Sequence, residues 1–349
     1  ICGAPAQILT AAELSIGLRI AGVTRADIRE ALWTGRSLVK SRGPRGTVHL
    51  LPTRDLPLWT GALGAVPSAG GLLPPDVRLT PEQTEAVVAA IADALADAEL
   101  TVDELTAALV AALGPWAGEP VMPAFQGFWP RWCQAMETAT NRGAMCFGPN
   151  KGRKVTYTNP RRWLPGFRSA DGPTAVAELL RRYLHAYGPA TPHHFAQWLA
   201  APRRWARDLF ARLGDELAEV EVEGSRAWVV AGDTAPAAAP PAGVLLLPYF
   251  DAYTVGCHPR EHLFPGRAAA RALAGSQAGN FPVLLIDGTV AGVWHQRRAG
   301  RALAITVEPL GTLTAGQRRE LDRQVARVGA ILEGRPTLTI GAVTVGPHA

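Results

Sequence analysis

Two segments of this sequence contain several cationic residues and no acidic ones, and such segments can bind anions. The first segment lies between Glu30 and Asp55, and the second lies between Glu137 and Asp171. In both, cations alternate with β-branched and apolar residues around Gly/Pro turns, a pattern that predicts two-stranded ribbons. Cations on such ribbons neutralise phosphates, so each ribbon is expected to lie against a polyanion. The residues assigned to this contact are Arg42, Arg45, Thr47, Lys151, Arg153, Lys154, Arg161 and Arg162.

Charge is distributed unevenly over the rest of the chain. The 349 residues carry a net charge of +5, yet residues 79–130 contain no Lys or Arg while acidic residues recur there. Such segregation suggests one face for a polyanion and another for solvent. The alternative is that both charge runs are ordinary solvated surface. Because the cations fall in predicted hairpins, the sequence favours a polyanion, and duplex nucleic acid in particular.

The first basic segment follows two predicted helices. Residues 8–22 place apolar side chains close to helical spacing, and Thr24 caps a second helix that ends at Gly35. Helices followed by a basic hairpin are the outline of a winged helix, whose helix and wing both lie against DNA phosphates. We therefore predict a first winged helix over residues 1–70. Because the chain starts at Ile1 without Met, we expect a preceding segment of this module to be missing.

Two further modules repeat this order of elements. Over residues 71–170, a helix that starts at Thr80, a helix that Thr101 caps with Glu104, and an aromatic helix over 125–143 precede the second basic hairpin. Over residues 171–235, three helices precede a hairpin that turns at Glu223. This third wing is acidic instead of basic, so packing within the protein is the alternative to contact with DNA.

The last third of the sequence has a different pattern. Residues 236–243 are rich in Pro and Ala and predict a linker. Residues 244–349 contain several strand patterns and one helix over 316–334, which predict a small domain. The predicted fold class is therefore α+β: three tandem winged-helix modules, each a helix-turn-helix with a β-hairpin, and a C-terminal α+β domain. No apolar run reaches the length of a membrane span.

Four segments of the chain resemble those of a known family. They occur in order along nearly the whole chain, and Arg45-Gly46-Thr47 followed by His49-Leu50 is the most specific of them. The segments are GAPAQ at 3–7, LVKSRGPRGTVHLLP at 38–52, YGPATPHHFAQWL at 187–199 and LPYFDAYTVG at 247–256. On these residues, the sequence resembles the winged-helix DNA glycosylases of the AlkZ-like and YcaQ-like type.

The resemblance implies a fold and an activity. Proteins of this type consist of tandem winged helices around a channel of the size of DNA, and they excise bulky N-alkylated purines or unhook crosslinks. The resemblance implies no metal or organic cofactor. It implies duplex DNA, alkylated or crosslinked, as the partner of a cytoplasmic monomer that acts in repair or self-resistance.

The resemblance also implies catalytic residues. The family motif is Gln-apolar-Gln, and here the corresponding residues are Pro5, Ala6 and Gln7. Gln7 matches the second position and is the candidate for orienting water, whereas Pro5 replaces the first glutamine. His49 is the second catalytic candidate; cross-strand packing is its alternative role. Because of Pro5, a non-catalytic DNA-binding protein, either a regulator or a lesion binder, is the alternative function.

Several other residues have side chains that could bind a base, a metal ion or an arginine. Trp129 and Trp132 are expected in the core, with base stacking as their alternative role. His193 and His194 are expected at a helix start and not at a metal, because a third ligand at useful spacing is lacking. Asp251 is a candidate for orienting an arginine. The four cysteines predict reduced, mostly buried thiols. The sequence contains neither a nucleophile elbow nor a phosphate-binding P-loop.

Overall fold

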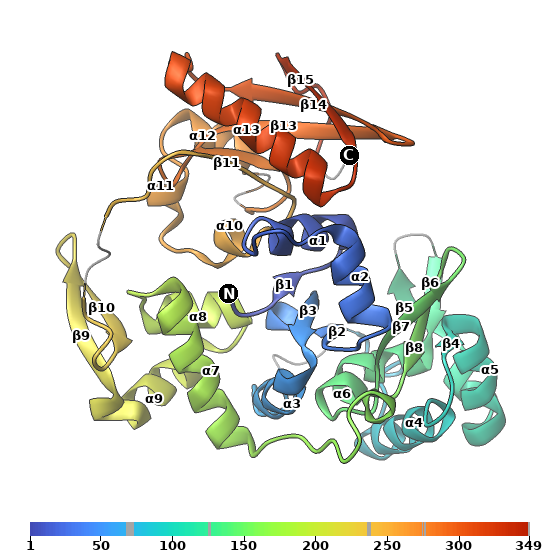
Figure 1. Ribbon diagram of the computed structural model, residues 1–349. Helices are drawn as coiled ribbons and strands as arrows, with labels where there is room; N and C mark the ends of the chain where they lie inside the picture. The colour runs from blue at the N-terminus through green and yellow to red at the C-terminus, as the bar shows by residue number, and fades with distance from the viewer. Residues whose placement is uncertain (68–72, 125–126, 236–238, 274, 276, 348–349) are drawn as a thin grey trace. The chain divides into compact units, whose positions relative to one another are not determined.

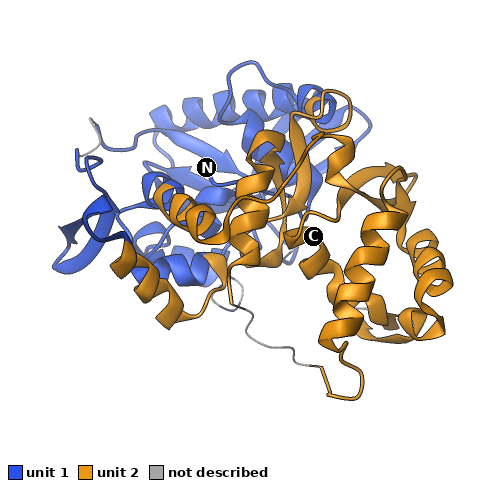
Figure 2. Ribbon diagram, turned by 90° about the horizontal axis from the view of Figure 1, so that it is seen from below, with its two compact units in different colours: residues 1–30, 182–198, 213–349 blue, residues 31–181, 199–212 orange. Residues whose placement is uncertain are grey.

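The chain was analysed in a computed structural model whose described residues form two compact units (Figure 2). Unit 1 combines 1–30, 182–198 and 213–349, and unit 2 combines 31–181 and 199–212. Each unit therefore joins segments that are far apart in the sequence. The boundary predicted near residue 70 and part of the predicted linker, 236–238, lie outside the described residues. The structure describes residues 1–67, 73–124, 127–235, 239–273, 275 and 277–347.

Helices and strands both recur along the chain, which confirms the predicted α+β class (Figure 1). The helices of the described part are α1 (Leu9–Gly17), α2 (Arg25–Trp33), α3 (Leu56–Gly64), α4 (Pro81–Ala94), α5 (Val102–Leu113), α6 (Met136–Asn141), α7 (Gly172–Tyr187), α8 (Pro192–Leu199), α9 (Arg203–Leu213), α10 (Ala252–Gly256), α11 (Arg260–Leu263), α12 (Arg267–Ala272) and α13 (Ala315–Ile331). The strands are β1 (Ala4–Pro5), β2 (Leu38–Arg42), β3 (Val48–Pro52), β4 (Leu100–Thr101), β5 (Pro120–Ala124), β6 (Gly127–Pro130), β7 (Cys146–Lys151), β8 (Lys154–Thr158), β9 (Leu217–Val222), β10 (Ser225–Val230), β11 (Val244–Leu247), β12 (Val283–Ile286), β13 (Thr289–Ala299), β14 (Ala302–Pro309) and β15 (Arg335–Ile340).

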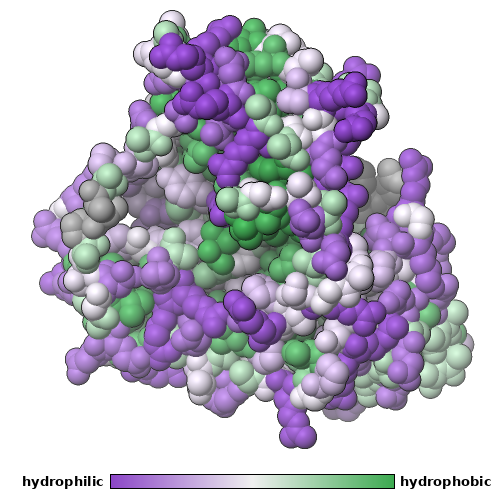
Figure 3. Space-filling model, in the orientation of Figure 1, coloured by the Kyte–Doolittle hydropathy of each residue, from purple (hydrophilic) through white to green (hydrophobic). Residues whose placement is uncertain are grey.

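The C-terminal segment of unit 1 forms a five-stranded sheet in the order β11-β12-β13-β14-β15. Only β14 and β15 are parallel, because α13 connects them and returns the chain to the starting edge. One side of α13 packs on β11 and β15, and its outer side forms a hydrophilic band in Figure 3. Buried side chains such as Trp294 fill the layer between helix and sheet, and Trp294 donates a hydrogen bond to the carbonyl of Leu247 at 2.9 Å.

α1 belongs to this core as well. Leu14 is fully buried in the same apolar cluster, and Gly17 lies against Ile331 of α13, where a methyl group would clash. The helix expected over 8–22 stops at Gly17, and Ile20, expected on its apolar side, is 50% exposed. A turn follows the helix there, in which the Arg19 N–H donates to the Ile16 carbonyl at 2.9 Å, and the Arg19 side chain also binds the Ser15 carbonyl and hydroxyl.

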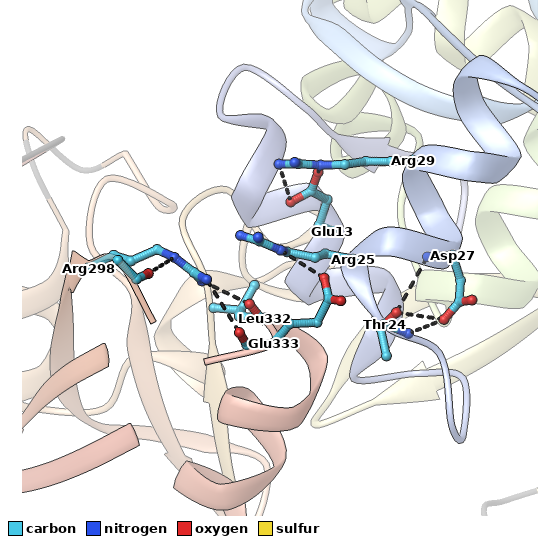
Figure 4. A network of polar contacts seen from close by, with 9 residues as sticks. Glu13, Thr24, Arg25, Asp27, Arg29, Arg298, Leu332 and Glu333 are labelled. Carbon is cyan, nitrogen blue, oxygen red and sulfur yellow. Dashed lines mark hydrogen bonds and ion pairs between the residues drawn. The ribbon is translucent and has the colours of Figure 1, made fainter. Parts of the chain in front are cut away.

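Ion pairs fix α1 and α2 within unit 1 (Figure 4). Arg29 of α2 holds the fully buried carboxylate of Glu13 at 2.5 Å, and burial raises the pKa of Glu13 despite this partner. Arg25 binds Glu333 at 3.0 Å, just beyond the end of α13. The backbone of this helix end also accepts hydrogen bonds from Arg298 at the Leu332 and Glu333 carbonyls. Ion pairs and apolar contacts therefore join α1, the first part of α2 and the end of α13.

Unit 2 has a small sheet in the order β4-β8-β7 beside α4, α5 and α6. Both predicted helix starts are confirmed: Thr80 and Thr101 each accept a hydrogen bond from the third residue of α4 and α5 in a capping box. The core between these elements is closed by Trp132, whose ring is fully buried and whose Nε1 donates to the Thr106 hydroxyl at 2.9 Å.

The aromatic helix predicted over 125–143 is wrong in its first part, whereas Arg131–Ala135 and Met136–Asn141 are helical. Residues Pro120–Ala124 and Gly127–Pro130 form a separate two-stranded ribbon, and helical structure starts only after it. Phe125 and Gln126 lie outside the described residues. Gly127 has a φ of +107°, which an α-helix does not contain, and Pro130 lacks the N–H that a helix interior needs.

The third group of elements follows the predicted order α7, α8, α9 and the β9–β10 hairpin. The hairpin turns at Glu223 and Gly224, both with positive φ, as expected for a tight turn. Thr191 caps α8 as predicted, accepting a hydrogen bond from the His194 N–H at 3.2 Å. Among the residues that the structure describes, no helix is long and apolar enough to cross a membrane.

Candidate functional site

Gln7 lies at the start of α1 in unit 1, where the backbone bends into the helix. Ala4, Pro5 and Ala6 are buried, and Gln7 is the first exposed residue after them. Within the described part of the chain, its carboxamide makes no hydrogen bond to the protein. The buried residues before it fix the backbone, and the exposed amide is a hydrogen-bonding group that faces solvent.

The helix that follows Gln7 is anchored by Asp251, which precedes α10. The Asp251 carboxylate is fully buried and accepts hydrogen bonds from the two terminal nitrogens of the Arg19 guanidinium, from Nη2 at 2.8 Å and from Nη1 at 2.9 Å. It also accepts a hydrogen bond from the Ser15 hydroxyl at 2.6 Å and one from the Tyr253 N–H at 2.9 Å. Asp251 was expected to orient an arginine, and the structure identifies that arginine as Arg19.

The Arg-Gly-Thr segment of unit 2 forms the turn between β2 and β3. The Thr47 N–H donates to the Pro44 carbonyl at 3.2 Å, and the Thr47 hydroxyl donates to the same oxygen at 3.0 Å. Arg45 has a φ of +61°, which is strained for a residue with a β-carbon. Arg42 folds back onto the turn and donates to the Gly46 carbonyl at 2.8 Å. The side chains of Arg42 and Thr47 therefore hold the turn, and the turn fixes the position of the Arg45 backbone.

His49 supports this turn from inside. The side chain is 2% exposed, and burial lowers its pKa to about 4. The ring is therefore neutral at neutral pH. Nδ1 lies 2.9 Å from the Thr47 carbonyl and must carry the proton, which leaves the lone pair on Nε2. Gly43 packs flat on the ring, where a β-carbon would come within 2.7 Å of it. Burial favours packing as one role of His49, and its catalytic role stays a prediction.

A cleft of about 610 Å³ opens beside this turn, within unit 2. Arg45 and Gly46 form one wall, the ends of α3 and α6 form others, and Leu199 with Ala200 completes it. Its polar lining comes mainly from Gln134, Glu137, Thr138, Asn141 and Arg142. The sequence analysis assigned Arg45 to this region but missed the α6 residues, because they belong to a segment expected to pack as an aromatic helix.

The second basic hairpin, β7–β8, carries its own counter-charges. Lys151 lies 3.1 Å from Glu104, and Lys154 lies 2.6 Å from Asp103, both at the start of α5. The Thr101 N–H, Lys151 and the Thr101 hydroxyl lower the pKa of Glu104 to about 2, so this carboxylate is ionised throughout the neutral range. Arg162 similarly binds Glu99 at 3.2 Å and the Thr158 hydroxyl at 2.8 Å.

Two of the cations assigned to phosphate differ from these. Arg153 at the hairpin tip and Arg161 after β8 are exposed, and neither forms an ion pair within the described chain. Arg153 and Arg161 are therefore the cations of this region most available to an external anion. The phosphate contacts assigned to all these residues, and to Arg42, Arg45 and Thr47, stay predictions.

Two side chains missed by the sequence analysis lie against aromatic rings. The Lys40 ammonium is 5.0 Å from the centre of the Phe147 ring, and burial lowers the pKa of Lys40. The Arg36 guanidinium lies 5.7 Å from the centre of the Trp163 ring. Both contacts are cation–π pairs between elements of unit 2. They were not predictable, because the ring and the cation are more than 100 residues apart.

The remaining candidates are resolved by burial. Trp132 lies in the core as expected, whereas Trp129 is 46% exposed and the core prediction for it is wrong. Cys2, Cys133 and Cys146 are buried, and the four cysteines are thiols that form no disulfide. The described ranges contain no group of three or more His, Cys, Asp or Glu residues arranged to hold a metal ion.

Comparisons with known proteins give the class of this protein. The sequence matches the family of AlkZ-like DNA glycosylases over residues 2–331. The interstrand DNA cross-link repair glycosylase of Streptomyces sahachiroi is 31% identical over 306 residues, which are 84% of this chain and 80% of that protein. The solved structure of Streptomyces sahachiroi DNA glycosylase AlkZ matches with a TM-score of 0.81 and 30% identity, over 97% of this chain and 91% of the other.

The chain therefore belongs to the AlkZ-like DNA glycosylase family. This confirms the resemblance drawn from the sequence, and DNA repair glycosylases are its relatives. The match to the solved structure also supports the mixed α+β architecture as a whole.

Proposed function

We propose that this chain is a DNA glycosylase that hydrolyses the N-glycosidic bond of N-alkylated purines in duplex DNA, including purines joined in an interstrand crosslink. The observation that carries this proposal is the exposed Gln7 carboxamide at the start of α1, in a member of a DNA glycosylase family. The name of the Streptomyces sahachiroi relative supports crosslinked DNA as a substrate. We further propose that the protein acts as a cytoplasmic monomer.

The chemistry that we propose needs little from the protein. A purine alkylated at N7 is already cationic, so its glycosidic bond breaks with little assistance from an acid. The enzyme must then place a water molecule and stabilise positive charge on the sugar. A carboxamide is too weak a base to deprotonate water, but its oxygen accepts a hydrogen bond and orients the molecule. Gln7 has that role in our proposal.

DNA binding by three winged helices is part of the same proposal. It is supported in residues 80–158 by the order α4, β4, α5, α6, β7 and β8, with β4 pairing with β8. The order α7, α8, α9, β9 and β10 supports it in the third module, where Ala190 pairs with Trp228 as a short third strand. Helices followed by a two-stranded wing place cations against phosphates and so position the protein without reading sequence.

A non-catalytic DNA-binding protein is the alternative function. The specific observation in its favour is Pro5, which is buried and stands where the family motif has its first glutamine. A proline side chain offers no hydrogen bond to water. Loss of one polar group of this kind costs about tenfold to a thousandfold in rate. A labile cationic lesion tolerates such a loss better than a neutral base does.

The proposal is tested by incubating the protein with a duplex that carries one N7-methylguanine and converting abasic sites to strand breaks. Release of the base by the wild type supports a glycosylase that works with one amide. If the wild type binds the duplex and only the Pro5→Gln variant releases the base, the alternative function holds. The Pro5→Ala variant is the control, because it relieves the ring without adding an amide.

A further inference from the structure

Phe128 and Trp129 are the only exposed aromatic side chains in the part of the chain that the structure describes. Phe128 is 63% exposed and Trp129 is 46% exposed. Each exposed ring keeps a large apolar surface in water, which is unfavourable relative to burial. Soluble proteins keep such surfaces mainly where a ligand covers them. Because successive side chains of a strand point to opposite faces, the two rings lie on the two faces of the ribbon, and each ring indicates a contact surface.

The base of the ribbon that carries these rings is held by several contacts. Arg131, just beyond β6, binds Glu119, just before β5, with N–O distances of 2.6 and 3.1 Å. The backbone N–H of Arg131 also donates to the Glu119 carbonyl at 2.7 Å. Trp129 pairs across the ribbon with Met122, which packs against the core of unit 2. The rings are thus presented by a fixed stem, so little conformational entropy is lost when they bind.

The sequence of the ribbon disfavours a protein strand as its occupant. Pro120, Pro123 and Pro130 lack the N–H groups that an added strand would need. Pairing of a partner strand along the edge, the common way in which a peptide joins a sheet, is therefore obstructed. Contact must come through the side chains instead of the backbone.

The charge of the ribbon and its neighbours favours nucleic acid. Residues 120–130 contain no Asp or Glu, so phosphates meet no repulsion from the ribbon itself. Glu119, an acidic residue at its base, is paired with Arg131 at 2.6 Å. The same unit carries the β7–β8 hairpin, whose tip residue Arg153 is exposed, and both hairpins rise from the helices of unit 2 toward the same side in Figure 1.

We propose that Phe128 and Trp129 stack against nucleobases of the DNA substrate, as an aromatic platform with one ring on each face of the β5–β6 ribbon. This inference rests on the proposed function insofar as DNA is the ligand. Stacking on an aromatic ring needs no particular base, because every base has a π face. The platform therefore adds affinity for distorted or opened base pairs without reading sequence. Apolar side chains that enter a groove in this way also bend the duplex.

The test measures binding of a fluorescein-labelled duplex, with and without one N7-methylguanine, across a series of salt concentrations. We expect Phe128→Ala and Trp129→Ala each to weaken binding about fivefold to a hundredfold, the effect of losing one stacked ring. The slope of affinity against salt should not change, because no phosphate contact is removed. Trp129→Phe should retain most of the affinity. Phe128→Leu should behave like Phe128→Ala, since leucine keeps apolar area but has no π face.

Ile20→Ala is the matched control, because Ile20 is 50% exposed in unit 1 and its truncation should leave binding unchanged. Unchanged binding in both ring variants would overturn the inference, and so would a wild-type dimer that the ring variants abolish, since the platform would then be a protein interface. Binding is scored separately from base release. A wild type that binds through the rings but releases no base refutes the glycosylase proposal alone, and a wild type that binds no DNA refutes both.

Discussion

At the scale of single residues, His49 belongs to the motif that follows Arg45-Gly46-Thr47, and its side chain is buried beside the turn that these residues form. Its ring is enclosed by Gly43 and hydrogen-bonded to Thr47, so it holds the shape of the turn that presents Arg45. Burial, with no carboxylate in contact, favours the neutral form of the ring. The stability of the fold should therefore depend on pH through this residue.

We predict that stability falls between about pH 6.5 and pH 4 because of His49. Its folded-state pKa of about 4 lies below the value of about 6.5 for an unfolded chain. As pH falls through this window, the unfolded chain takes up the proton first, so stability that is complete above pH 6.5 is progressively lost. From roughly pH 7 to pH 5 the loss should be about 2 kcal/mol. Urea unfolding of the wild type and of His49→Gln at both pH values measures it.

The exposed His262 provides the control, and His262→Gln should keep the pH dependence of the wild type. Equal pH dependence in the wild type and in His49→Gln would show that the buried ring does not control stability in this window.

At the scale of elements, α1 and the β7–β8 hairpin are both held by charges that the sequence alone could not pair. Asp251 lies 232 residues from Arg19, and Lys151 lies 47 residues from Glu104. The Asp251–Arg19 pair fixes α1, which begins two residues after the catalytic candidate Gln7. In the second case the pairs hold cations that were expected to contact phosphate.

We predict that Asp251→Ala loosens α1 and reduces catalysis. The substitution leaves the Arg19 guanidinium without its buried partner, and breaking such a pair costs about 3–5 kcal/mol. The unfolding free energy should fall by this amount, and the rate of base release should fall in protein that remains folded. Adding Arg19→Met should restore part of the stability, because no unpaired charge remains. Asp27→Ala, which removes an exposed carboxylate at the start of α2, should have a much smaller effect on both measurements. Equal losses in the two aspartate variants would contradict this account.

We predict that the double substitution Asp103→Asn with Glu104→Gln strengthens DNA binding. It releases Lys151 and Lys154 and removes two negative charges from the same surface. Each lysine that then contacts a phosphate should steepen the dependence of affinity on salt by about 0.9 in the logarithmic slope. Fluorescence anisotropy over a salt series measures the change. Asp93→Asn with Asp97→Asn is the matched control from unit 2. An unchanged slope in the released-lysine variant would show that this hairpin does not contact the backbone.

At the scale of the whole molecule, local patterns were predictable and long-range contacts were not. The capping boxes at Thr80 and Thr101 and the hairpin after Arg36 depend on neighbouring residues, and the sequence predicted them. The helix predicted over 125–143 failed because its aromatic residues occur in both a ribbon and a core segment. Composition does not separate these two environments.

The candidate site shows the same division. The exposed position of Gln7 follows from the bend before α1, whereas the arginine partner of Asp251 and the cleft beside Arg45 depend on how distant segments pack. The modules predicted from chain order also differ from the two compact units, because α1 joins the core of the C-terminal sheet. The winged-helix modules themselves remain a proposal.

The measurement that tests the central claim most directly is the single-turnover rate of base release from a duplex with one N7-methylguanine, for the wild type and for Gln7→Ala. We predict that the wild type releases the base and that Gln7→Ala is slower by about tenfold to a thousandfold, with DNA affinity and unfolding free energy unchanged. Thr10→Ala, an exposed polar residue one turn further along α1, should react like the wild type. Equal rates for the wild type and Gln7→Ala would contradict the account, because the exposed carboxamide would then have no part in catalysis.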